Sequence, residues 1–199
     1  GFSNVVNGKT DGAQLAGFMN ITRKDINGFQ MAGFANVAAN NAHVVQIAGF
    51  SNTAKDTLTG VQISGFINAA KHVNGSQIGF INICDSMENG IPLGFLSIVR
   101  KGYHKLEVGG SESFYGIASL KLGVPRFYNI LSIGIKPEGD MFLWGPGYGV
   151  GTDLKLNEKY NMNIDVISYA IFDSEHNWKV EPWEGGNWDY EYSSLNTLS

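Results

Sequence analysis

The chain has 199 residues, a formal net charge of −4, and acidic and basic side chains that are interspersed, which argues against a nucleic-acid-binding surface. Its single cysteine, Cys84, excludes an intrachain disulfide. No apolar run approaches the length of about 18 residues that a transmembrane helix needs, whereas spanning strands have a weaker pattern that composition does not exclude. Because the sequence starts partway through a repeat, we expect that the true N-terminus has been removed.

Residues 1–104 repeat the pattern Gly-x-Gln-Ile-Ala-Gly-Phe-x-Asn, first in units of 16 residues and then in units of 15. A fixed short period indicates an array in which each unit is stabilised mainly by its neighbours. Three columns define the repeat: a Gln column, an Asn column that Ser97 closes, and a Phe column. The Phe column consists of Phe2, Phe18, Phe34, Phe50, Phe66, Phe80 and Phe95.

In the shortened units the missing residue falls beside the second glycine, since Ile63-Ser64-Gly65-Phe66 becomes Ile78-Gly79-Phe80. Removing one residue from an unbroken strand would turn every later side chain to the other face. We therefore expect a corner or bulge at this glycine. It would separate two short strands, such as 61–63 and 66–69, which polar links such as residues 71–74 follow.

Two arrangements fit this pattern. In a β-solenoid each unit makes one coil, so that Phe stacks on Phe and the Asn and Gln columns form amide ladders. In an antiparallel meander or barrel wall, Asn74-Gly75 and Asn89-Gly90 would instead be hairpin turns. The identity of the columns favours the solenoid, and we interpret all three columns as architectural.

Residues 105–199 lack the repeat and alternate over longer segments, which predicts strands at 105–108, 114–122, 127–135, 141–156 and 160–172, with a turn at 157–159. This pattern indicates an antiparallel β-meander, sheet or partial barrel, whose edge could cover the end of the array. Glycines occupy every second position from Gly145 to Gly151, but no phosphate-loop signature follows. We expect this glycine face to let a neighbouring aromatic ring or backbone approach.

Several segments carry a resemblance to a known group. The units at 60–68 and 75–82, the exit from the array at 94–105, the segments 112–115 and 126–129 and the strand around Gly149-Val150-Gly151 resemble the bacterial surface-repeat proteins. The resemblance spans most of residues 1–172. It implies export to the envelope of a Gram-negative bacterium and a C-terminal part similar to outer-membrane β structure. The resemblance does not imply any particular activity, because the group has no assigned chemistry to carry onto particular residues.

The residue patterns offer little for catalysis. The four histidines, His43, His72, His104 and His176, lack metal-ligand spacing, and no nucleophile elbow or distinct carboxylate pair is present. We expect neither an enzyme nor a bound metal or cofactor. The weak candidates for ligand binding are in the C-terminal tail, where Trp178, Trp183, Trp188 and Tyr190 lie beside acidic residues.

Flat aromatic rings near acids can stack on sugars or contact a protein, although a hairpin loop or an aromatic belt at a membrane would have the same composition. The main hypothesis is a non-catalytic cell-surface scaffold with a protein or glycan partner and no nucleic acid. The alternatives are an outer-membrane β-barrel with a pore or transport role, a glycan-binding module and, least favoured, a hydrolase.

Overall fold

The computed structural model describes residues 1–138, 141–156 and 160–173, and every regular element in those ranges is a β-strand. This confirms the predicted all-β class. The chain separates into two compact units: the array unit, residues 1–103 with 122–128, and the antiparallel unit, residues 104–121 with those from 129 onward. The sequence predicted a single boundary after residue 104. The observed division differs from it chiefly in residues 122–128, which group with the array.

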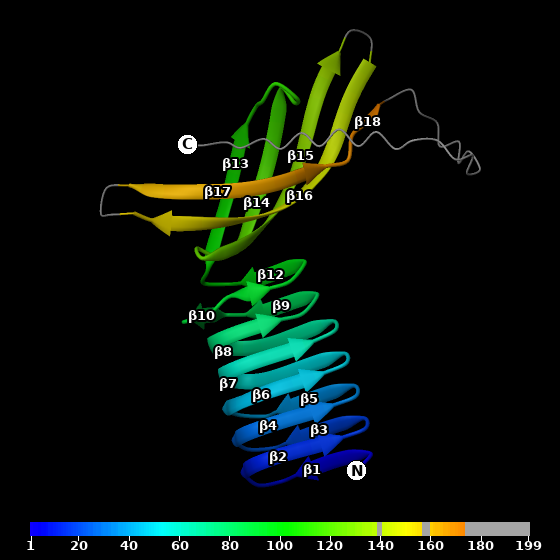
Figure 1. The fold of residues 1–199 in the computed structure, drawn as a ribbon, viewed down its shortest axis with the longest axis vertical. Coiled ribbons are helices and arrows are strands. Elements are labelled where there is room, and N and C mark those ends of the chain that lie inside the picture. Colours follow the sequence, from blue (N-terminus) through cyan, green and yellow to red (C-terminus); the bar gives the residue numbers. More distant parts are fainter. Residues whose placement is uncertain (139–140, 157–159, 174–199) are drawn as a thin grey trace, which may run out of the picture. The chain divides into compact units, whose positions relative to one another are not determined.

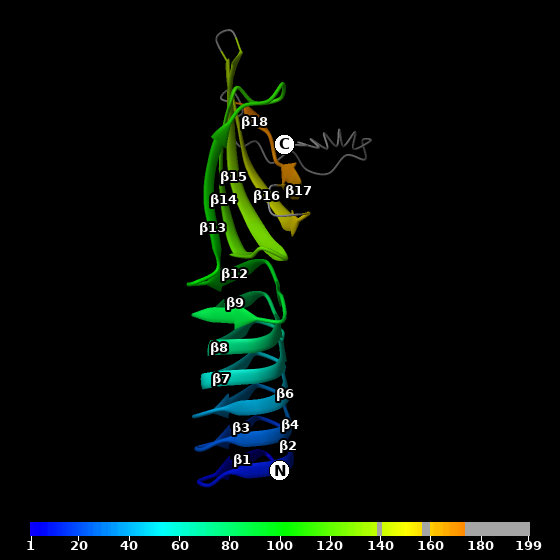
Figure 2. The ribbon, with the colours of Figure 1, turned by 90° about the vertical axis from the view of Figure 1, so that its left-hand side faces the viewer.

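The array unit is a β-solenoid whose strands pair in parallel with the strands one repeat away (Figures 1 and 2). Asn36 lies opposite Asn52 and Gln46 opposite Gln62, so the columns of the sequence are columns in space. The solenoid prediction is therefore confirmed. Its strands are β1 Ser3–Val6, β2 Thr10–Ala16, β3 Met19–Thr22, β4 Ile26–Ala32, β5 Ala35–Ala38, β6 Ala42–Ala48, β7 Ser51–Ser64, β8 Ile67–Ile78, β9 Ile81–Cys84, β10 Ser86–Glu88, β11 Pro92–Leu93 and β12 Leu96–Val99.

The alternative in which Asn74-Gly75 forms a hairpin turn is wrong. Both residues lie inside β8 and pair in parallel with Thr59 and Gly60 of β7. The link at 71–74 is likewise part of a strand, because β7 and β8 each continue through their links. Their register shifts between Ala54 and Thr57, so one residue is lost in the link as well as one beside the glycine.

The predicted corner is confirmed, because the chain bends at each Gly-Phe pair between two strands, as at residues 49–50 and 65–66. The corner requires glycine because successive coils lie very close together there. A Cβ atom added to Gly49 would lie only 2.2 Å from the backbone oxygen of Gly33 in the coil below, a separation that no side chain tolerates.

Two buried amide ladders run through the interior of the array. In the Gln ladder each side-chain Nε2 donates to the Oε1 of the preceding rung, as Gln46 does to Gln30 at 2.7 Å. In the Asn ladder each Nδ2 donates to the Oδ1 of the following rung, as Asn36 does to Asn52 at 2.9 Å. The two ladders therefore have opposite polarity. Buried amides need partners, and stacking identical coils supplies them at every rung between the ends of the ladders.

The opposite end of each coil encloses a small aliphatic core that includes Leu58, Val73, Cys84 and Val99. Val124, the last residue of the strand at 116–124, belongs to the same cluster. Residues 122–128 thus cover the C-terminal end of this core, as a cap does in other solenoids. The rings of Tyr103 and Tyr128 stack beside it with centroids 4.8 Å apart.

The antiparallel unit is built on one curved sheet with the strand order β13-β14-β15-β16-β17, and β18 also pairs with β16 (Figure 2). The strands are β13 Tyr103–Gly109, β14 Gly116–Val124, β15 Phe127–Glu138, β16 Met141–Lys155, β17 Asn161–Tyr169 and β18 Phe172–Asp173. These bounds agree with the predicted strands within a few residues, except that 160–172 divides into β17 and β18. The predicted turn at 157–159 lies outside the described residues.

Candidate functional site

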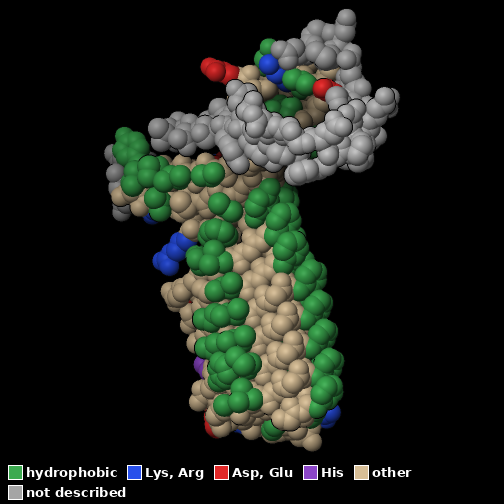
Figure 3. All heavy atoms as spheres, turned by 45° about the vertical axis from the view of Figure 1, so that its right-hand side comes forward, with side chains coloured by type: hydrophobic (Ala, Val, Ile, Leu, Met, Phe, Trp, Pro, Cys, Tyr) green, Lys and Arg blue, Asp and Glu red, His purple; other side chains and the backbone are tan. Residues whose placement is uncertain are grey.

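The most extensive surface feature of the array is a row of seven stacked phenylalanine rings, which we call the phenylalanine edge. Neighbouring ring centroids are 4.9–5.9 Å apart and the rings are nearly parallel. The side chains are from 38% to 77% exposed. Figure 3 shows hydrophobic side chains running in continuous stripes along the array. The edge consists of Phe2, Phe18, Phe34, Phe50, Phe66, Phe80 and Phe95.

The positions that flank the phenylalanine edge are uncharged. In the rung of Phe50 they are Ile47, the last residue but one of β6, and Ser51, the first residue of β7. Equivalent positions in the other rungs carry Leu, Met, Ile, Ala or Ser. The charged side chains of the array lie in or beside the links instead, where Lys9 pairs with Asp25. Charge is therefore confined to one side of each coil.

Stacking limits what the phenylalanine edge can recognise. The faces of every ring between the two ends of the row are covered by the rings above and below, so the edge presents ring rims rather than ring faces. Rims carry the positive side of the aromatic quadrupole. Face-on stacking with a sugar or a planar base is therefore blocked along the row, whereas contact with an apolar surface is available.

The antiparallel unit separates polar and apolar side chains by face. On β15, Leu131, Ile133 and Ile135 are exposed together, as their alternation predicts, while Ser132 between them is buried. On β17, Ile164 and Val166 are exposed in the same way. Met162, the third predicted member of their face, is less exposed than these two and is half-buried. The outward positions of β13 to β17 carry no charged side chain in the described residues.

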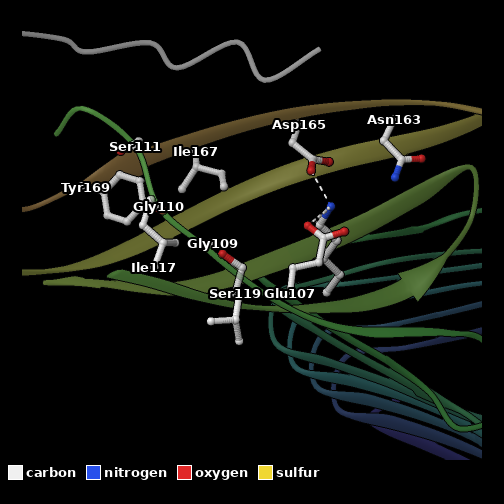
Figure 4. A pocket seen from close by; sticks show the side chains of 12 residues that line it. Glu107, Gly109, Gly110, Ser111, Ile117, Ser119, Asn163, Asp165, Ile167 and Tyr169 are labelled. Carbon is white, nitrogen blue, oxygen red and sulfur yellow. Dashed lines mark hydrogen bonds and ion pairs between the residues drawn. The ribbon is translucent and has the colours of Figure 1, made fainter. Parts of the chain in front are cut away.

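The inward side of the curved sheet holds a cavity of about 370 Å³ (Figure 4). The buried ammonium group of Lys121, on β14, lies 2.7 Å from a carboxylate oxygen of Glu107 on β13 and 2.5 Å from one of Asp165 on β17. Figure 4 shows Asp165, Glu107 and Asn163 at one end of the cavity and Tyr169, Ile117 and Ser111 at the other.

The ion pairs fix the charge states in this cavity. Burial alone would lower the pKa of Lys121, but its bonds to Asp165 and Glu107 outweigh burial and raise it. Burial likewise acts to raise the pKa of Glu107, but bonds from Lys105 and Lys121 lower it overall. Lys121 is therefore held as an ammonium ion, which is neither a base nor a nucleophile.

The glycine-lined strand behaves as predicted at two positions. A Cβ atom added to Gly147 would lie 2.6 Å from the ring of Tyr169, and one added to Gly145 would lie 3.0 Å from the ring of Phe114. These glycines therefore let aromatic rings approach the backbone of β16.

The structure does not test the ligand-binding candidates of the tail, because Trp178, Trp183, Trp188 and Tyr190 lie outside the described residues.

Of the histidines, His72 hydrogen-bonds Ser86 at 2.8 Å between neighbouring rungs. In the described part of the chain, no group of three His, Cys, Asp or Glu side chains could hold a metal ion.

Sequence reasoning missed the Lys121 ion pairs, because Lys121 and Asp165 are 44 residues apart. The available signal was the isolated lysine beside Leu120 in a predicted strand, since alternation places the two side chains on opposite faces.

Comparison of the chain with protein-family models, with curated proteins and with solved structures finds no significant match. In the described residues, the structure contains no helix that is long and apolar enough to cross a membrane.

Proposed function

We propose that this protein is a non-catalytic scaffold of a bacterial cell envelope, in which the array holds an interaction surface at the cell exterior. The phenylalanine edge carries the proposal, because it is an uncharged, exposed and regularly spaced surface on a stiff framework. Each rung is fixed by backbone pairing and by two amide ladders. Such a framework keeps its contact groups in place before a partner arrives, which lowers the entropic cost of binding.

The chemistry of the buried reactive groups supports a non-catalytic role. Lys121 is held as an ammonium ion between two carboxylates. Cys84 is 1% exposed, and burial, with a smaller effect of the Asp85 charge, raises the pKa of its thiol to about 12. A thiol in that state is a poor nucleophile at neutral pH.

Surface labelling tests the location. A Lys55→Cys variant of the full-length protein places a thiol in an exposed link, and the buried Cys84 gives little background. We expect a membrane-impermeant maleimide to label intact cells as strongly as lysed cells. Labelling that requires lysis would refute display at the exterior. The unsubstituted protein, treated in parallel, measures any reaction of Cys84.

The second candidate is a membrane-embedded barrel with a pore or transport role, and the uncharged outward face of the antiparallel unit favours it. Lipid-facing strands alternate apolar and polar side chains in this way and place charge on the inner side. The partner of that face would be lipid, which would anchor the protein at an outer membrane. Apart from the two-residue β18, the described strands of this unit have 7 to 15 residues, a range that includes the length of about 9–11 residues that such spans need.

Fluorescence quenching tests the membrane contact at Trp144, which is exposed on β16. With Trp178, Trp183 and Trp188 replaced by Phe, we expect brominated lipids to quench Trp144 after reconstitution. The matched control carries Trp144→Phe and Ile117→Trp, which moves the fluorophore to the cavity. Equal quenching of the two variants, or none in either, would refute lipid contact by this face.

A further inference from the structure

The phenylalanine edge is larger than the apolar patches that monomers usually expose. A phenylalanine buries about 150–250 Å² when fully covered. At the observed exposures the seven rings therefore offer roughly 600 Å². Leu15, Met31, Ile78 and Leu93 beside them are also exposed, and they bring the surface to roughly 900 Å². The largest patch on a typical monomer is about 300–600 Å², whereas a stable protein interface needs about 800 Å² from each partner.

The period of the edge restricts which protein surface can cover it. Rungs repeat about every 4.8 Å, so a ring rim recurs at this spacing over the whole row. A helix laid along the row repeats every 5.4 Å. It would drift by about 0.6 Å per rung, which amounts to more than half a rung across the row. An identical array has the same period and stays in register from end to end.

Charge does not oppose such a contact. The positions that flank each ring are uncharged, and the ion pairs of the array lie in or beside the links, as in Lys9–Asp25 and Arg100–Asp85. Two copies that meet edge to edge would therefore bury no unpaired charge. The ring rims of one copy would pack against the ring rims and flanking aliphatic side chains of the other.

We propose that the phenylalanine edge is a self-association surface, through which two copies of this chain pair array against array. The contact is isologous, with the same surface on both sides and a two-fold axis between them, so the assembly closes as a dimer. This inference rests on the proposed scaffold function. It identifies a second copy of the chain as the first partner of the scaffold.

Cross-linking tests the contact without changing the rings. Ser51 lies in the position that follows Phe50, whereas Lys55 lies in an exposed link. We expect a short bis-maleimide to cross-link the Ser51→Cys variant of the full chain into dimers at least ten times more efficiently than the Lys55→Cys variant. Equal efficiency, or preferential cross-linking through residue 55, would overturn the proposal.

Ring removal provides a second measurement. Sedimentation velocity should show a wild-type dimer, and Phe50→Ser with Phe66→Ser should raise its Kd at least tenfold. The control Val45→Ser removes an exposed apolar side chain elsewhere on the array and should leave the Kd within about twofold. Retained β-sheet circular dichroism and an unreactive Cys84 establish that the variants are folded. A monomeric wild type, or a dimer unaffected by ring removal, would contradict the proposal.

Lipid is the competing occupant of the phenylalanine edge, and flotation with phosphatidylglycerol vesicles separates the two. If the wild type is monomeric and floats, and the two-ring variant does not float, the edge binds lipid and self-association is wrong. That result would leave the surface-labelling test of the scaffold function intact. If only the dimer is lost on ring removal, while flotation is unchanged, the proposal stands.

Discussion

We predict that replacing a glutamine in the middle of the Gln ladder destabilises the array more than replacing the glutamine at its end. Gln46 is fully buried, donates to Gln30 Oε1 at 2.7 Å and accepts from Gln62 Nε2 at 2.8 Å. A Gln46→Leu substitution keeps the approximate shape but leaves one acceptor and one donor unsatisfied. Each such group costs about 1–3 kcal/mol. Since Gln62 keeps a 3.4 Å contact with the oxygen of Ala69, we expect a loss of about 2–4 kcal/mol in the free energy of unfolding.

Gln14 is the matched control, because its Nε2 is already without a partner at the end of the ladder. Replacing Gln14 by Leu removes that donor together with the Oε1 that accepts from Gln30 and from the hydroxyl of Thr22. Both groups have another neighbour, because the Nε2 of Gln30 lies 3.5 Å from the hydroxyl of Thr22, which lies 3.4 Å from that of Thr10. We expect a loss of only about 1 kcal/mol.

The assay should report on the array alone. Cys84 is buried in its core, so the urea concentration at which a thiol reagent labels half of it measures unfolding of this unit. With a typical slope of about 1–3 kcal/mol per molar urea, Gln46→Leu should lower this midpoint by roughly 1–2 M. If the two leucine variants have the same midpoint, the ladder does not stabilise the array and the reasoning is wrong.

Three further predictions follow from other features. Gly60 has φ of +133° and an added Cβ would lie 2.3 Å from the oxygen of Val44, whereas Gly12 has φ of +119° and no atom within 4 Å of an added Cβ. In thermal melts, Gly60→Ala should therefore lose at least about 3 kcal/mol of unfolding free energy and Gly12→Ala about 1 kcal/mol. Equal losses would exclude the steric contact as the cause. The pKa of Glu107 is below its usual 4.5, so its contribution to stability is present above pH 4.5 and is lost as the pH falls through the lowered value. An acid titration followed by circular dichroism should show an extra loss of stability below pH 4.5. The Glu107→Gln variant should lack this additional pH dependence. Cys84, whose pKa is about 12, should react with a thiol reagent at pH 8 at least a hundredfold more slowly in the native protein than in urea, and comparable rates would mean that the array opens readily.

The array was predictable because its period is strict. The same residue recurs at the same place in each unit, and only in-register parallel stacking brings Gln46 next to Gln62 and Asn36 next to Asn52. The corner was predictable from a missing residue that left the columns intact. The second missing residue was less visible, because Ala54–Thr57 and the shorter stretch opposite them lie in a variable link that has no column to count against.

The candidate sites were less predictable. A repeat identifies the phenylalanine column, but it does not say whether the column faces the interior or the solvent. The sequence favoured an architectural role, and the stacked rings have one, yet their rims are also exposed. The tail aromatics, including Trp183 and Trp188, remain predictions because they lie outside the described residues.

The sequence alone determined the repeat and its columns, and it favoured an arrangement in which like side chains lie above one another, because stacked strands of one period bring identical positions together. It also determined the alternation of polar and apolar side chains in the later strands, which follows from the two-residue period of a strand. Only the tertiary structure decided that the amides turn inward and the phenylalanines outward, since that depends on how each coil closes. It also decided that Lys121 meets Asp165, because the curvature of a sheet sets which distant strands face each other across its inner side.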